Sequence, residues 1–95
     1  MDGTSRRVID NLRVRGLLDL VDNVCLRRGI TRDELCGRCR TRALTRARHE
    51  LWYLILEHPE RYYSQSEIGR LFERDHTTVA SGIRAHQQRE ADQAH

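Results

Sequence analysis

The sequence predicts an all-α domain, a bundle of five to six helices, and three observations carry this prediction. Apolar residues recur at steps of three and four through most of the chain, which is the spacing of one helix face. Two segments have a Ser or Thr followed three residues later by Glu, a capping box that marks a helix start. No segment alternates strictly between apolar and polar residues, as a half-buried strand would. The 95 residues suffice for one small helical core.

The first helix is predicted to end at Gly29, because glycine readily adopts the left-handed conformation that terminates helices. Its apolar face follows steps of three and four residues, and a start as far upstream as Val8 stays open. This face consists of Val14, Leu17, Leu18, Val21, Val24 and Cys25. Residues 1–5 precede the pattern and are predicted to be a flexible N-terminus.

A short helix and a longer one are predicted next. Thr31 and Glu34 form the first capping box, which opens a short helix through about Leu35 that Gly37 ends. The longer helix terminates at Pro59, because proline disfavours helical geometry in the residue before it. The inner stripe of the longer helix consists of Leu44, Ala47, Leu51, Leu54, Ile55 and His58.

The segment 64–88 has the spacing of a helix-turn-helix. Ser64 and Glu67 form the second capping box, which opens another short helix. The apolar side of this helix consists of Ile68, Leu71 and Phe72. Glu73 and Arg74 form the turn that follows. The second helix of such a motif normally enters the major groove of DNA, although the spacing alone equally fits two helices that only pack together.

The final helix is predicted to run from His76 to about Gln88, because Asp75 is a strong N-cap residue. Its inward positions are Val79, Ile83 and His86. Its outward positions hold short donors, acceptors and methyl groups, with one long cation at the far end. They are His76, Thr77, Ala80, Ser81 and Arg84. Such a face fits the floor of a DNA groove, and residues 89–95 are predicted to be a flexible tail.

The positive charge is concentrated in one part of the chain. All 17 basic residues are arginine, the formal net charge is +3, and residues 38–48 hold five arginines and no acid. Arginine offers a planar fork of donors that suits phosphates and guanine edges. A run of charge is usually a solvated helix face, so this cluster alone leaves DNA contact open.

Several classes of location are disfavoured. No apolar run approaches the roughly 18 residues that span a bilayer, and no secretory signal is visible at the start. Three cysteines, an odd number, favour reduced thiols over a disulfide framework. We therefore expect a cytoplasmic protein with no membrane partner, and binding of the arginine cluster to DNA would make it nucleoid-associated.

Two strings of residues carry a family resemblance over roughly residues 14–88. The strings are Ser66-Glu67-Ile68-Gly69-Arg70-Leu71-Phe72 with Arg74-Asp75-His76-Thr77-Thr78-Val79, and upstream Ile30-Thr31-Arg32-Asp33-Glu34-Leu35 with the arginines of 38–48. Together they resemble the C-terminal DNA-binding domain, domain IV, of the bacterial replication initiator DnaA. The resemblance implies a Trp-repressor-like arrangement of six helices with an embedded helix-turn-helix, a single DNA-binding domain over residues 6–88.

The resemblance also implies roles for individual residues. Asp75, His76 and Thr77 match the positions that read bases in the major groove, and Arg40, in the basic loop of residues 36–42, matches an arginine that enters the minor groove. A Thr methyl can pack on thymine, and an Asp can accept from the cytosine amino group. The phosphate-contacting set consists of Arg42, Arg46, Arg48 and Thr78, to which we add Arg38, Ser81 and Arg84.

Three departures from the family pattern stand out. The turn lacks the two glycines that many initiators carry before the arginine, is one residue shorter and contains Glu73. The connection from His58 to Tyr63 is longer than usual. A chain without lysine has no P-loop, so we expect a stand-alone module without an ATPase, an accessory or regulator of replication initiation or transcription. No heptad seam is visible, which favours a monomer.

Three features of the sequence suggest sites other than a DNA interface. Cys36 and Cys39 form a CxxC, but with Cys25 or His49 they lack the spacing of a four-ligand zinc site, so neither metal nor cofactor is predicted. A low-pKa thiolate beside the arginines is a redox hypothesis. His76 has no nucleophile or carboxylate constellation around it, which argues against an enzyme and a small-molecule substrate.

A protein-interaction adaptor is the alternative function. It would keep the helical scaffold and use Trp52, Tyr62 or Tyr63 to bind a replication protein. An adaptor would have no need for the outward set of arginines and short polar residues, so DNA binding is the leading hypothesis.

Overall fold

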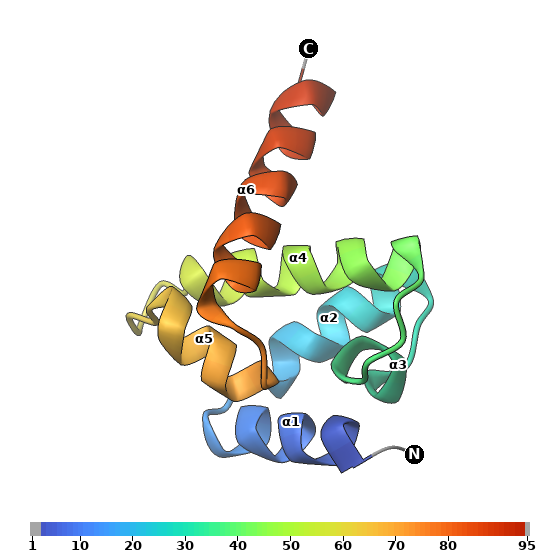
Figure 1. The fold of residues 1–95 in the computed structure, drawn as a ribbon, viewed down its shortest axis with the longest axis vertical. Coiled ribbons are helices and arrows are strands. Elements are labelled where there is room, and N and C mark those ends of the chain that lie inside the picture. Colours follow the sequence, from blue (N-terminus) through green and yellow to red (C-terminus); the bar gives the residue numbers. More distant parts are fainter. Residues whose placement is uncertain (1–2, 95) are drawn as a thin grey trace.

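The computed structural model describes residues 3–94, which form six helices and no strand (Figure 1). In chain order they are α1 (Gly3–Val14), α2 (Leu18–Arg28), α3 (Arg32–Cys36), α4 (Arg42–Leu56), α5 (Gln65–Phe72) and α6 (His76–Gln93). The predicted all-α class is confirmed. None of the helices within residues 3–94 has the length and apolar character that crossing a membrane requires.

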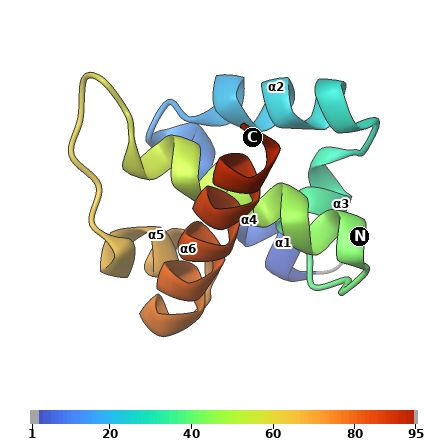
Figure 2. The ribbon, with the colours of Figure 1, turned by 90° about the horizontal axis from the view of Figure 1, so that it is seen from above.

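Helix α4 is the centre of the bundle and packs against α2, α3, α5 and α6. Seen from above, α2 and α5 lie on opposite sides of α4 (Figure 2). Helix α6 crosses α4, and its C-terminal half extends away from the other helices (Figure 1). The side chains of Leu51 and Ile55 on α4 and of Val79 on α6 are fully buried at this centre. The crossing therefore fixes where the start of α6 lies.

The N-terminal part differs from the prediction of one helix ending at Gly29. Gly16, with a φ of +71°, separates α1 from α2. Its amide donates to the Arg13 carbonyl at 3.0 Å, and the Leu17 amide donates to the Leu12 carbonyl at 2.9 Å. This pair of bonds is a Schellman motif, which ends a helix at a left-handed residue. The apolar period continues across the break because Leu12 and Leu17 are both buried in one core.

Helices extend nearer to both ends of the described chain than the sequence predicts. Helix α1 begins at Gly3, and Thr4 and Ser5 are buried where a flexible terminus was expected. Ser5 donates a hydrogen bond of 2.7 Å to the Asp33 carboxylate on α3. Residues 1 and 2 of that expected terminus, and residue 95 of the tail, lie outside the described residues. At the other end, α6 continues to Gln93 instead of ending near Gln88.

The two capping boxes are confirmed. Thr31 accepts from the Glu34 amide at 3.1 Å while Glu34 accepts from the Thr31 amide at 2.9 Å. Ser64 and Glu67 form the same reciprocal pair at 3.1 and 3.2 Å. These bonds satisfy amides that a helix start leaves unpaired. Helix α4 ends at Leu56, so His58, expected on its inner stripe, lies beyond its end.

Gly82 allows the close crossing of α6 over α4. A methyl group there would lie 2.5 Å from Cδ2 of His49 and 2.8 Å from Cζ3 of Trp52.

This crossing predicts the effect of a Gly82→Ala substitution. Helix propensity alone favours alanine over glycine by about 1 kcal/mol. Gly82→Ala is nevertheless expected to lower the free energy of unfolding by about 1–3 kcal/mol, because overpacking dominates. Urea unfolding measures this change, with Ser81→Ala as an exposed control on the same helix; a stabilised Gly82→Ala variant would contradict the crossing geometry.

Candidate nucleic-acid interface

The basic loop and the start of α6, far apart in sequence, meet at one concave surface, which we call the central hollow. It has a volume of about 470 Å³. Its lining comes from the basic loop, α4, the turn before α6 and α6 itself. The lining residues are Arg40, Thr45, Arg48, His49, Trp52, Arg74 and Thr78. Arg40, expected in the minor groove, and Thr78, expected at a phosphate, thus line the same space.

The start of α6 has the capped geometry that the sequence predicted. Asp75 accepts a hydrogen bond of 3.1 Å from the Thr77 amide, and this bond lowers the pKa of Asp75. Val79, Ile83 and His86 are buried. The positions expected to face a partner are exposed except Ala80, which is half-buried. The exposed ones are His76, Thr77, Thr78, Ser81 and Arg84.

The short turn depends on an unusually close approach between α5 and the backbone that follows it. A Cβ at Gly69 would lie only 2.6 Å from the Arg74 carbonyl oxygen. The Arg74 amide donates to the Gly69 carbonyl at 2.8 Å. Glu73 occupies the left-handed region with a φ of +56°, where glycine is usual. Sequence reasoning did not single out Gly69 for this role, although a glycine inside a short helix signals close packing.

Arg48 holds the basic loop instead of lying exposed. Its guanidinium donates to the carbonyls of Leu35 at 2.8 Å, Cys39 at 2.6 Å and Glu34 at 2.8 Å. Only 4% of Arg48 is exposed. The last carbonyls of α3 have no partners within their own helix, and Arg48 satisfies two of them. The structure therefore gives Arg48 an anchoring role, and its phosphate contact stays a prediction.

Arg74 anchors the other end of the loop. Its Nη2 donates to the Gly37 carbonyl at 3.1 Å, which joins the turn before α6 to the start of the basic loop. Burial, and then the charges of Arg38 and Arg40, lower the pKa of Arg74. The guanidinium groups of Arg38 and Arg40 thus lie near enough to Arg74 to disfavour its charged form. Sequence reasoning placed Arg74 only in the turn.

The remaining arginines of the predicted interface are exposed. They are Arg38, Arg40, Arg42, Arg46 and Arg84. Arg38 also donates from Nε to the Thr4 hydroxyl on α1 at 3.2 Å. Of these five, Arg40 lines the central hollow, whereas Arg46 lines another hollow together with Glu50 and Glu90. Exposed guanidinium groups suit the phosphates of a nucleic acid backbone.

The CxxC does not form a reactive thiolate at its first cysteine. Cys36 is buried, and burial raises its pKa to about 12. The redox hypothesis of a low-pKa thiolate is therefore wrong for Cys36. Cys39 is exposed. Among residues 3–94, no group of three metal-ligating side chains is brought together.

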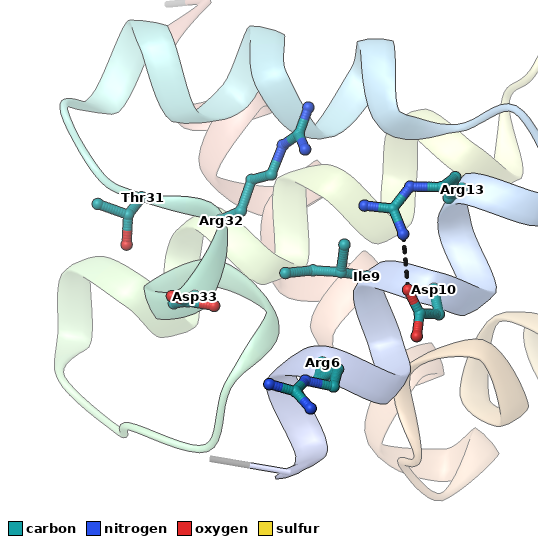
Figure 3. Close-up of a pocket in the computed structure, with 7 residues that line it drawn as sticks. All are labelled: Arg6, Ile9, Asp10, Arg13, Thr31, Arg32 and Asp33. Atoms are coloured by element: carbon teal, nitrogen blue, oxygen red, sulfur yellow. Dashed lines mark hydrogen bonds and ion pairs between the residues drawn. The ribbon is translucent and has the colours of Figure 1, made fainter. Parts of the chain in front are cut away.

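A second hollow of about 630 Å³ lies between α1 and α3, and Figure 3 shows its lining. Two of its three lining arginines, Arg13 and Arg32, are paired with acids. Arg13 donates to Asp10 at 2.7 Å, and Arg32 donates to Asp22 through two bonds of 2.7 and 2.8 Å. Its lining also contains two carboxylates, Asp10 and Asp33, whereas the lining of the central hollow contains arginines and no carboxylate.

The three aromatic residues of the adaptor hypothesis have different environments. Trp52 and Tyr63 are each only 2% exposed, whereas Tyr62 is 84% exposed. Trp52 packs edge-on against Phe72 with ring centroids 6.0 Å apart. Trp52 and Tyr63 are therefore core residues, and Tyr62 alone of the three is available to a protein partner.

The arrangement defines a class of protein: a helix-turn-helix DNA-binding domain in which a basic loop lies beside the second helix. Residues 18–85 match the family described as bacterial dnaA protein helix-turn-helix, and the chain belongs to this family. The family is a DNA-binding one and not a catalytic one. No curated protein and no solved structure matches the chain. Helix α1 lies outside the matched region.

The anchoring role of Arg48 predicts a loss of stability. Arg48→Met is expected to lower the free energy of unfolding by about 3 kcal/mol, because three carbonyls lose a charged donor in a buried setting. Arg42→Met, an exposed position in the first turn of the same helix, provides the control and is expected to change little. Urea unfolding measures both. An Arg48→Met variant as stable as the parent chain would refute the anchoring role.

Burial of Cys36 predicts selective alkylation. With iodoacetamide at neutral pH, the folded protein is expected to be modified quickly at Cys39 and not at Cys36, because a buried thiol with a raised pKa supplies almost no thiolate. Peptide mass spectrometry before and after unfolding in urea locates the label. Rapid modification of Cys36 in the folded protein would show that its burial is not maintained in solution.

Proposed function

We propose that this chain binds a DnaA-box-like site in double-stranded DNA and reads it through two grooves at once. One observation carries the proposal: the basic loop and the first turn of α6 line the same hollow through Arg40 and Thr78. A duplex seated there would meet both elements. Because one face supplies both, a single copy of the chain suffices, and we propose that it binds as a monomer.

The first turn of α6 is proposed to read bases in the major groove. His76 and Thr77 are exposed on the turn that Asp75 caps. The Thr77 methyl can pack against a thymine methyl, and His76 can donate or accept at a base edge. Asp75 uses one oxygen, Oδ1, for the Thr77 amide, and its other oxygen can accept from the cytosine amino group.

Arg40 is proposed to enter the minor groove, and the neighbouring residues to bind phosphates. Narrow A·T-rich minor grooves have enhanced negative potential that attracts an arginine. The phosphate contacts are assigned to Arg38, Arg42, Arg46, Thr78, Ser81 and Arg84. Arg48 is left out because its guanidinium is bonded to three carbonyls.

We propose that the biological role is that of an accessory or regulator of replication initiation or transcription, with no ATPase of its own. The absence of lysine, and hence of a P-loop, supports it. A cytoplasmic, nucleoid-associated location follows from such a role. An adaptor that binds a replication protein is the second hypothesis, and the exposure of Tyr62 favours it.

Fluorescence-anisotropy titration tests the proposal, with a DnaA-box duplex and a scrambled duplex of equal composition at several salt concentrations. We expect tighter binding of the box. If four arginines each neutralise one phosphate, log K against log salt has a slope of about −3 to −4. Equal affinity for both duplexes would refute sequence reading, and the absence of DNA binding would leave the adaptor hypothesis.

Thr77→Ala is expected to separate base reading from phosphate binding. The variant should lose about 1–3 kcal/mol of binding free energy on the box and little on the scrambled duplex, because one base contact is lost. Arg46→Ala, a phosphate-contact variant, should weaken both duplexes alike and reduce the salt slope by about 1. An equal loss on both duplexes for Thr77→Ala would refute its base-reading role.

A further inference from the structure

Helix α1 lies outside the family-matched residues and contacts both elements of the proposed DNA reader. We propose that α1 is a positioning element: Arg7, Thr4 and Asn11 hold the turn before α6 and the basic loop in a fixed relation to each other. This inference rests on the two-groove reading proposed above. In Figure 1, α1 runs below α3 and the end of α5, and the contacts between elements place it against both.

The strongest contact joins Arg7 to Glu73 in the shortened turn. Arg7 Nε donates to Glu73 Oε2 at 2.6 Å, and Arg7 Nη2 donates to Oε1 at 3.0 Å. This two-bond fork fixes orientation as well as distance. The bond from Arg7 lowers the pKa of Glu73, so the carboxylate is ionised at neutral pH. An exposed ion pair adds little to global stability, so its removal leaves the fold intact.

Glu73 is unfavourable at its position because of both its backbone conformation and its charge. Its φ of +56° is strained for any residue with a Cβ, and glycine would relieve the strain. Its negative charge also lies two residues before Asp75, beside a surface proposed to meet phosphates. The pair with Arg7 explains both features, because only a side chain that reaches α1 can join this turn to that helix.

The same helix reaches the basic loop and the end of α5. The Thr4 hydroxyl accepts from Arg38 Nε at 3.2 Å and from Arg7 Nη2 at 3.3 Å, so it lies between the turn contact and the loop contact. Asn11 Nδ2 donates to the Leu71 carbonyl at 3.0 Å. Arg38 is two residues from Arg40, just as Glu73 is two residues from Asp75. A shift of α1 would therefore move both reading elements.

The effect of Glu73→Gln on DNA binding separates positioning by α1 from a simple effect of charge. Glu73→Gln removes a negative charge near the DNA surface, and charge alone predicts tighter binding to every duplex. Positioning by α1 predicts instead that the ratio of affinities for the DnaA-box and scrambled duplexes falls about tenfold, the scale of one lost base contact. An unchanged or higher ratio would overturn the proposal.

Variants on α1 supply the matched controls. Arg7→Gln is expected to lower the ratio as Glu73→Gln does. Arg6→Gln makes the same charge change at the neighbouring exposed position and should weaken both duplexes slightly at constant ratio. The double variant with Arg7→Glu and Glu73→Arg should recover the ratio. Equal behaviour of Arg7→Gln and Arg6→Gln would overturn the proposal.

Amide hydrogen exchange of the free protein decides the question without DNA. Arg7→Gln should speed exchange of the Arg74 amide, which is bonded to the Gly69 carbonyl, while amides in α2 keep their parent rates. If the parent chain showed no preference for the DnaA-box duplex, the proposed function would fail, and faster exchange at Arg74 would still support positioning by α1. Unchanged exchange at Arg74 would overturn the positioning role.

Discussion

The interface depends on one buried cation, the guanidinium of Arg48. Its three bonds join α4 to the last carbonyls of α3 and to Cys39 in the basic loop. Because Arg74 holds the loop at Gly37, the segment leading to Arg40 is fixed near both of its ends. An exposed arginine on a held backbone reaches a groove at a lower cost in free energy, since ordering a mobile loop on binding costs conformational entropy.

Local signals of the sequence were sufficient for most of the fold. Thr31, Ser64 and Asp75 cap helices as predicted, because capping depends on residues three or fewer positions away. The inward spacing of Val79, Ile83 and His86 likewise identified the outward face of α6. The family motif then selected DNA binding among the uses of such a face.

Features that depend on distant packing were missed. Arg46 and Arg48 are the same residue type in one run of charge, yet only Arg48 lies where the end of α3 offers it carbonyls. Tyr62 and Tyr63 are neighbours, and one is exposed while the other is buried. Gly16 ends a helix without interrupting the apolar period, so the pattern could not reveal the break. No local rule distinguishes these cases.

The distribution of ion pairs explains how a chain of net charge +3 can present a strongly positive face. Away from the interface, Arg27 and Arg28 both bond Glu50, at 2.8 and 3.0 Å, and Arg32 bonds Asp22. Within residues 3–94, no carboxylate pairs with the exposed arginines from 38 to 46. Acids thus neutralise arginines elsewhere, and the exposed arginines from 38 to 46 keep the charge that the proposed phosphate contacts require. In the function we propose, non-specific affinity comes from a few charges, and discrimination between sequences comes from short side chains whose placement is set by the helices behind them.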